Sequence, residues 1–122
     1  MTFSSETLAA ALEAQDAVAV AFALRNDRVA VPLLGGDQVR VFRRDDADKY
    51  MLLLFSSMDT YQIMLPEESD LTVAAYDAAT LKDFLAQNIG VLEAVWFDVA
   101  GPHAMQATPQ DVLDALELSA EA

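Results

Sequence analysis

The segment from Lys49 to Ser57 constrains the fold of this chain more than any other. Six consecutive apolar residues, 50–55, are typical of a short central strand that is buried on both faces of a sheet. Two hydroxyl residues, Ser56 and Ser57, end the run abruptly and can begin a helix. The segment therefore predicts a polar corner at the carboxyl end of a central strand, where binding sites often form.

The remaining elements alternate between helical and extended patterns. An Ala-rich segment from Ser5 to Arg25 favours helix, and Asp16 is an alternative start for a second helix within it. The expected strands span 28–34, 39–43, 49–55, 71–76, 91–99 and 104–107, and the other expected helices follow Ser56, Asp77 and Thr108. We expect one α+β domain over residues 1–122, with an ordered core from about 5 to 118. Its predicted architecture is a single-layer mixed β-sheet of five to six strands with about four helices packed on it.

Two local patterns make finer predictions. Pro32 indicates that the strand over 28–34 lies at a sheet edge or ends there, because proline donates no backbone hydrogen bond. Such an edge would offer a route to a homodimer. The sequence Ser56-Ser57-Met58-Asp59 predicts a capping box in which Ser56 accepts from the Asp59 amide.

Composition excludes several classes of site. The 122 residues include no cysteine and one histidine, so thiolate zinc sites, disulfides and cysteine nucleophiles are excluded. No P-loop, dinucleotide fingerprint or EF-hand spacing occurs, and we expect no cofactor and no metal. The N-terminus has no signal-peptide pattern and no apolar run is long enough to cross a bilayer, which favours a soluble cytoplasmic protein.

Charge is strongly negative and unevenly distributed. The net charge of −13 disfavours binding to nucleic acids and to anionic membranes. Six of the seven basic residues nevertheless lie between positions 25 and 49. Arg40, Arg43 and Arg44 could form a positive partner-binding patch on a hairpin; the alternative is that they pair with neighbouring aspartates.

The residue types of a hydrolytic triad are present near two predicted strand ends. Ser56 or Ser57 could meet Asp98 and His103 there, but no Gly-x-Ser-x-Gly elbow accompanies them. The serines are also explained as helix caps and His103 as a turn residue. We therefore predict no catalytic residue, and treat Ser56, Ser57, Asp98 and His103 as candidates for partner binding.

Three segments together resemble the N-terminal domain of the SseB family, the enhanced-serine-sensitivity group. They are Val29–Leu33, matching a V-x-V-P strand; Leu54–Ser57, matching a strand that ends in F-T-S; and Val95–Pro102, matching a strand that enters an N-P-x-G turn. Ser56 replaces the usual threonine, and Asp98 and Val99 stand near the expected Asn-Pro. The resemblance covers about Ser5 to Leu118 and implies an α+β fold, a bacterial cytoplasmic setting and no established catalytic residues.

These observations predict a non-enzymatic binding or regulatory module that contacts an unknown protein partner. The contact surface would be the corner formed by Ser56, Ser57 and residues 98–103, or the basic hairpin. The alternative is a small-molecule-binding protein or weak hydrolase with a pocket near Ser57, Asp98 and His103.

Overall fold

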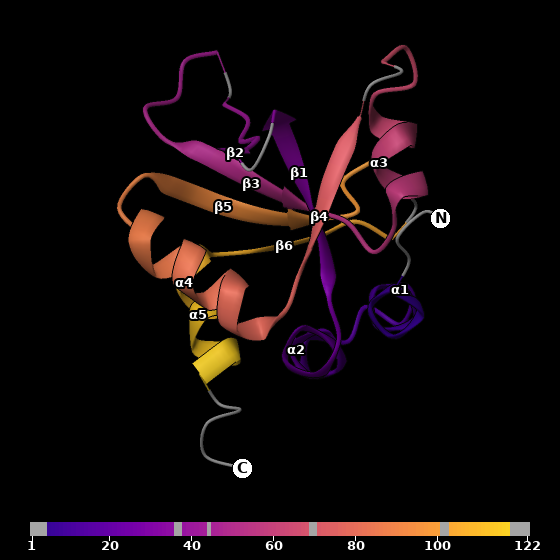
Figure 1. Cartoon of the computed structure of the whole chain (residues 1–122). Coiled ribbons are helices and arrows are strands. Elements are labelled where there is room, and N and C mark those ends of the chain that lie inside the picture. The colour runs from indigo at the N-terminus through magenta and orange to yellow at the C-terminus, as the bar shows by residue number, and fades with distance from the viewer. Residues whose placement is uncertain (1–4, 36–37, 44, 69–70, 101–102, 118–122) are drawn as a thin grey trace.

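The protein folds as α+β, with helices and strands interspersed along the chain (Figure 1). The structure is a computed structural model, and it describes residues 5–35, 38–43, 45–68, 71–100 and 103–117. These residues form five helices: α1 Glu6–Glu13, α2 Ala17–Asn26, α3 Met58–Met64, α4 Ala78–Asn88 and α5 Pro109–Glu117. They also form six strands: β1 Val29–Gly35, β2 Gln38–Val39, β3 Tyr50–Leu54, β4 Thr72–Tyr76, β5 Leu92–Phe97 and β6 Met105–Ala107.

The Ala-rich N-terminal segment forms two helices, the alternative that the sequence left open. Gln15 adopts a left-handed backbone with φ 53° and ends the first helix. Asp16 then caps α2, because its carboxylate accepts from the amides of Val18 and Ala19 at 3.0 and 3.2 Å.

The strands form two three-stranded sheets, so the prediction of one sheet of five to six strands is wrong. The orders are β2-β1-β4, which is antiparallel, and β3-β5-β6, in which β3 and β5 are parallel and β6 is antiparallel to β5. Among the described residues, the backbone pairs between the two sheet regions are isolated bridges: Ala30 with Phe55, and Phe42 with Met51. The sequence pattern located five of the six strands, but the strand expected over 39–43 is replaced by the two-residue β2 and an isolated bridge at Phe42. A period-two pattern also carries no information about which strands pair along their length.

Pro32 lies in the central strand of its sheet, so the expected edge at this strand is wrong. β1 pairs with β4 on one side and with β2 on the other. The carbonyl of Pro32 accepts from the amide of Arg40, which lies just beyond the end of β2. In an antiparallel sheet the amide nitrogen and the carbonyl of one residue face the same neighbouring strand. The nitrogen of Pro32, which has no hydrogen to donate, therefore faces the segment at Arg40, where β2 has already ended. A homodimer remains a prediction, but its route cannot be an edge at β1.

Two apolar clusters cover the two faces of β3. Leu52 and Leu54 point into the larger cluster, which also holds the buried residues of α1, α2, α4 and α5. Leu53 and Phe55 point into a smaller cluster with Tyr61 of α3. The predicted burial of this run on both faces is therefore confirmed from Leu52 onward. Figure 1 shows α3 on one side of β4, and α4 and α5 on the other.

No helix among the described residues is long and apolar enough to cross a membrane. The same residues contain no group of three or more histidine or carboxylate side chains that could hold a metal ion.

Candidate functional site

The structure joins Ser56 and Asp98 directly at the carboxyl ends of the parallel strands β3 and β5. Ser56 Oγ donates to Asp98 Oδ2 at 2.7 Å, and the Ser56 amide donates to Oδ1 at 2.8 Å. Thr60 Oγ1, in the first turn of α3, donates to Oδ1 at 3.0 Å. The amide of Asp98 donates to the carbonyl of Leu54 at 2.9 Å, which continues the pairing of the two strands.

Burial makes this corner structural. Ser56 is 2% exposed and Asp98 is 6% exposed, so neither can meet a partner or a substrate at the surface. Each donor that faces the carboxylate is used, and such a saturated buried network stabilises one conformation. The acidic residue that replaces the expected asparagine is therefore directed inward, where its second oxygen accepts from Ser56.

Ser57, one residue later, is the N-cap of α3. Its hydroxyl accepts from the amide of Thr60 at 3.2 Å, and its own backbone is extended. The capping box predicted from Ser56 and Asp59 is therefore wrong: the cap is Ser57, and the Thr60 hydroxyl donates to the Ser57 carbonyl at 2.9 Å instead of accepting from its amide. The Ser56 hydroxyl is directed toward Asp98, a contact that no local pattern could reveal.

His103 is separate from this network. The residue is exposed, and its carbonyl accepts from Nε2 of Gln15 at 3.3 Å. Among the described residues no hydrogen bond joins His103 to Ser57 or Asp98, so the structure does not assemble the triad. Neither of the two surface hollows described below is lined by Ser57, Asp98 or His103.

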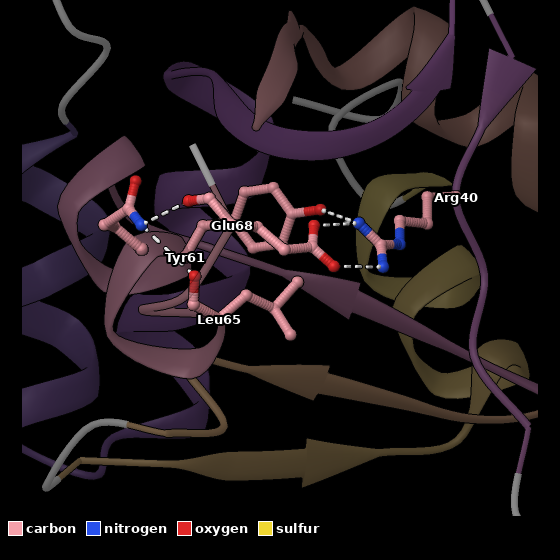
Figure 2. A network of polar contacts seen from close by, with 5 residues as sticks. Arg40, Tyr61, Leu65 and Glu68 are labelled. Atoms are coloured by element: carbon pink, nitrogen blue, oxygen red, sulfur yellow. Dashed lines mark hydrogen bonds and ion pairs between the residues drawn. The ribbon is translucent and has the colours of Figure 1, made fainter. Parts of the chain in front are cut away.

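The three arginines of the predicted basic patch have different surroundings. Arg40 donates two hydrogen bonds to the carboxylate of Glu68, at 3.0 and 3.2 Å, and one to the hydroxyl of Tyr61 at 3.2 Å (Figure 2). The Arg43 guanidinium lies 5.9 Å from the centre of the Tyr50 ring. Arg44 lies outside the described residues. Arg40 thus pairs with an acid that is 28 residues away, and not with an aspartate of its own hairpin.

The electrostatics of this cluster hold Arg40 in place. The hydrogen bond to Glu68 raises the pKa of Arg40, and the same bond lowers the pKa of Glu68. Burial raises the pKa of Tyr61, so its phenol stays neutral and donates or accepts as a hydroxyl. Because Glu68 already compensates its charge, Arg40 is poorly suited to bind an acidic partner. The two hydrogen bonds to Glu68 instead restrict the movement of the chain around Arg40.

A groove that the sequence did not predict lies between α2, α5 and the β6 edge of the second sheet. We call it the α2/α5 groove; its volume is about 360 Å³ and nine of its eleven lining residues are apolar. Phe97, Met105 and Ala107 form its sheet side, and Ala21 and Val112 lie on its two helical sides. Arg25 donates from Nη1 to the carbonyl of Ala115 at 3.3 Å and so links the two helices beside it.

The two lips of the groove differ in chemistry. On α2, Val18 is 77% exposed and neighbours the lining residue Ala21, because the two are three positions apart on the helix. On α5, the groove is lined by exposed Asp111, with Asp114 on the following turn. The sequence held one signal for this surface, namely an α2 segment that is apolar around its whole circumference.

A second hollow lies on the opposite face of the same sheet. We call it the Trp96 hollow; its volume is about 340 Å³, and Met51, Glu93, Ala94, Trp96 and Gln106 line it. The Trp96 ring is only partly buried in the smaller apolar cluster. The exposed part of an aromatic ring provides a site suited to a cationic group.

A family model for the SseB protein N-terminal domain matches residues 5–114. The chain belongs to the SseB N-terminal domain family. The match covers every described helix and strand except the end of α5, and it confirms the resemblance carried by the V-x-V-P strand and the two strand ends. A search among curated proteins found no match. In this SseB domain, therefore, a role has to be argued from the surfaces themselves.

Proposed function

We propose that this SseB domain is a non-enzymatic, bacterial cytoplasmic module that binds another protein. One observation supports this most strongly: the α2/α5 groove is an open, predominantly apolar surface, and the exposed Val18 lies one helical turn from Ala21, which lines it. Exposed apolar side chains that are continuous with a groove are a frequent feature of protein interaction sites. The partner-binding surface that we propose is therefore the α2/α5 groove and not the corner at Ser56.

The two earlier candidate surfaces contribute less. Ser56 and Asp98 are satisfied and buried, and Arg40 is held by Glu68. His103 remains a candidate contact, because Gln15 holds its carbonyl at the α1–α2 turn and Met105, two residues later, lines the groove. Ser57 and Arg43 remain candidates for partner contacts, but only at the periphery of the binding surface.

Site-specific photo-crosslinking tests this proposal. A photoreactive residue at Ala21, inside the groove, should give a reproducible adduct with one defined protein in the source cells. The matched control is Ala86, an exposed alanine of α4 that does not line the groove. If both positions give the same adducts, or if neither gives one, a partner at this groove is ruled out.

The groove volume favours a second candidate function. A volume of about 360 Å³ falls within the range of small-molecule pockets, so an apolar metabolite could occupy the groove. The small-molecule fraction of a cell extract should then raise the melting temperature of the wild type but not of Ala21→Trp, whose indole would fill the groove. An unchanged melting temperature of the wild type would count against a metabolite.

A further inference from the structure

β6 is an edge strand with a hollow on each of its two faces. The order β3-β5-β6 leaves its outer side without a neighbouring strand, and among the described residues no hydrogen bond reaches that side. Alternate backbone amides and carbonyls of such an edge point to solvent and can pair with an added strand. β6 is only three residues long, which limits how much strand it can pair, but it contains no proline, bulge or charged residue that would block pairing.

The side chains of β6 divide between the two hollows. Met105 pairs with Phe97 and Ala107 with Val95, and both Met105 and Ala107 line the α2/α5 groove. Gln106 pairs with Trp96 and is the one β6 residue that lines the Trp96 hollow, although it also borders the α2/α5 groove. Because opposite residues of paired strands point to the same face, an added strand would send alternate side chains into the two hollows.

We infer that β6 accepts an extended segment of a partner protein whose residues alternate between apolar and basic. This rests on the proposed protein-binding function and specifies the partner. Apolar side chains of the segment enter the α2/α5 groove beside Phe97, Met105 and Ala107. The intervening lysines or arginines lie over the ring of Trp96.

Charge favours a basic segment over a neutral one. The chain carries a net charge of −13, and Asp111 borders the groove at its α5 lip. A basic segment would be drawn to this surface at long range, whereas a second copy of this acidic chain would be repelled. Backbone pairing supplies affinity, and the two hollows supply the pattern that is recognised.

The test uses three pooled peptide libraries of about nine residues each, a typical strand length. The first alternates apolar residues with Lys or Arg. The second places the same residues at helical spacing, and the third alternates apolar residues with Asp or Glu. We expect the first to bind at least about tenfold more tightly than either control. Trp96 is the only tryptophan of the chain, so its fluorescence reports binding at the hollow.

N-methylation of the selected peptide examines strand addition without altering the protein. Methyl groups on the alternate amides that face β6 should abolish binding, whereas methyl groups on the other set should leave it within about twofold. Ala21→Arg should weaken binding at least about tenfold by placing a positive charge in the groove, and Ala86→Arg, with the same change of charge at a distance, should not.

Three outcomes would overturn the inference: preference for the helical library, equal binding of the acidic library, or equal loss with both methylated sets. Each is distinguishable from failure of the proposed function. An adduct at Ala21 together with any of these results would leave a protein-binding groove in place but exclude strand addition at β6. No adduct at Ala21 would remove the groove as a protein site.

Discussion

Asp98 combines a left-handed backbone with a buried carboxylate. Its φ of 47° belongs to a region where asparagine, aspartate and glycine are tolerated best, which explains why a short polar residue follows β5. The turn then directs the carboxylate back toward Ser56 and Thr60. A residue that the sequence offered as a candidate for partner binding therefore fastens β5 to the start of α3.

Replacement of Asp98 by alanine should lower the free energy of unfolding by about 3 kcal/mol, because buried donors of Ser56 and Thr60 lose their acceptor. Asp98→Asn should cost less, since it keeps one acceptor oxygen and tolerates the left-handed backbone. Urea unfolding measures both differences. Asp114→Ala, an exposed acid of α5, is the control and should change stability by no more than about 0.5 kcal/mol. An Asp98→Ala cost as small as that of the control would contradict a structural role.

At the scale of elements, the Arg40 cluster connects parts of the chain that are distant in sequence. Arg40 follows β2, whereas Tyr61 belongs to α3 and Glu68 follows that helix (Figure 2). Gln62 strengthens the turn after α3 by donating from Nε2 to the carbonyls of Leu65 and Glu68, at 3.1 and 2.9 Å. The cluster thereby holds the end of α3 against the hairpin segment.

This ion pair predicts a pH dependence with a definite sign. Arg40 lowers the pKa of Glu68, so the pair stabilises the fold above the ordinary glutamate pKa of about 4.3, and the stabilisation is lost as the pH falls through the lowered pKa. An NMR titration of the Glu68 side chain should show the lowered pKa in the wild type and an ordinary one in Arg40→Gln. Arg43→Gln, which removes a nearby charge without touching Glu68, should leave the lowered pKa in place. Identical titrations of the wild type and Arg40→Gln would exclude the pair in solution.

At the scale of the whole molecule, two sheets and two apolar clusters form one body. The backbone groups of Ala30 and Phe55 exchange hydrogen bonds at 2.9 and 3.0 Å, which ties β1 to the end of β3. β3 itself contributes to both clusters, with Leu52 and Leu54 on one side and Leu53 and Phe55 on the other. We expect one cooperative unfolding transition, because neither cluster can open without exposing this shared strand.

Leu85→Ala provides the test of that cooperativity. Leu85 lies fully buried in the larger cluster, and its truncation should cost about 2–5 kcal/mol. Trp96 packs against the smaller cluster on the other face. The urea midpoint followed by Trp96 fluorescence should therefore shift as far as the midpoint followed by far-ultraviolet circular dichroism. The exposed Gln87→Ala is the control. An unshifted fluorescence midpoint would show that the clusters unfold separately.

Local patterns in the sequence were sufficient for most elements and for several caps. The apolar run before Ser56 identified β3, Asp77 was correctly identified as the N-cap of α4 and Thr108 as the hydroxyl that begins α5. The resemblance to the SseB family was also carried by short strand motifs, and the family match confirmed it. These features depend on residues within about one helical turn or one strand of each other, so the sequence contains the interacting groups side by side.

Pairings between distant segments were decided only by the tertiary structure. Ser56 bonds with a residue 42 positions away and Arg40 with one 28 positions away, and the sequence offered equally plausible local roles for both. The division into two sheets, the α2/α5 groove and the open edge of β6 likewise depend on how elements meet. The sequence by itself determined the elements and the family, because these follow from periodicity and local hydrogen bonding. Tertiary packing decided which side chains are buried together and which surface stays open. Packing depends on many long-range contacts that form together, so no local pattern determines it.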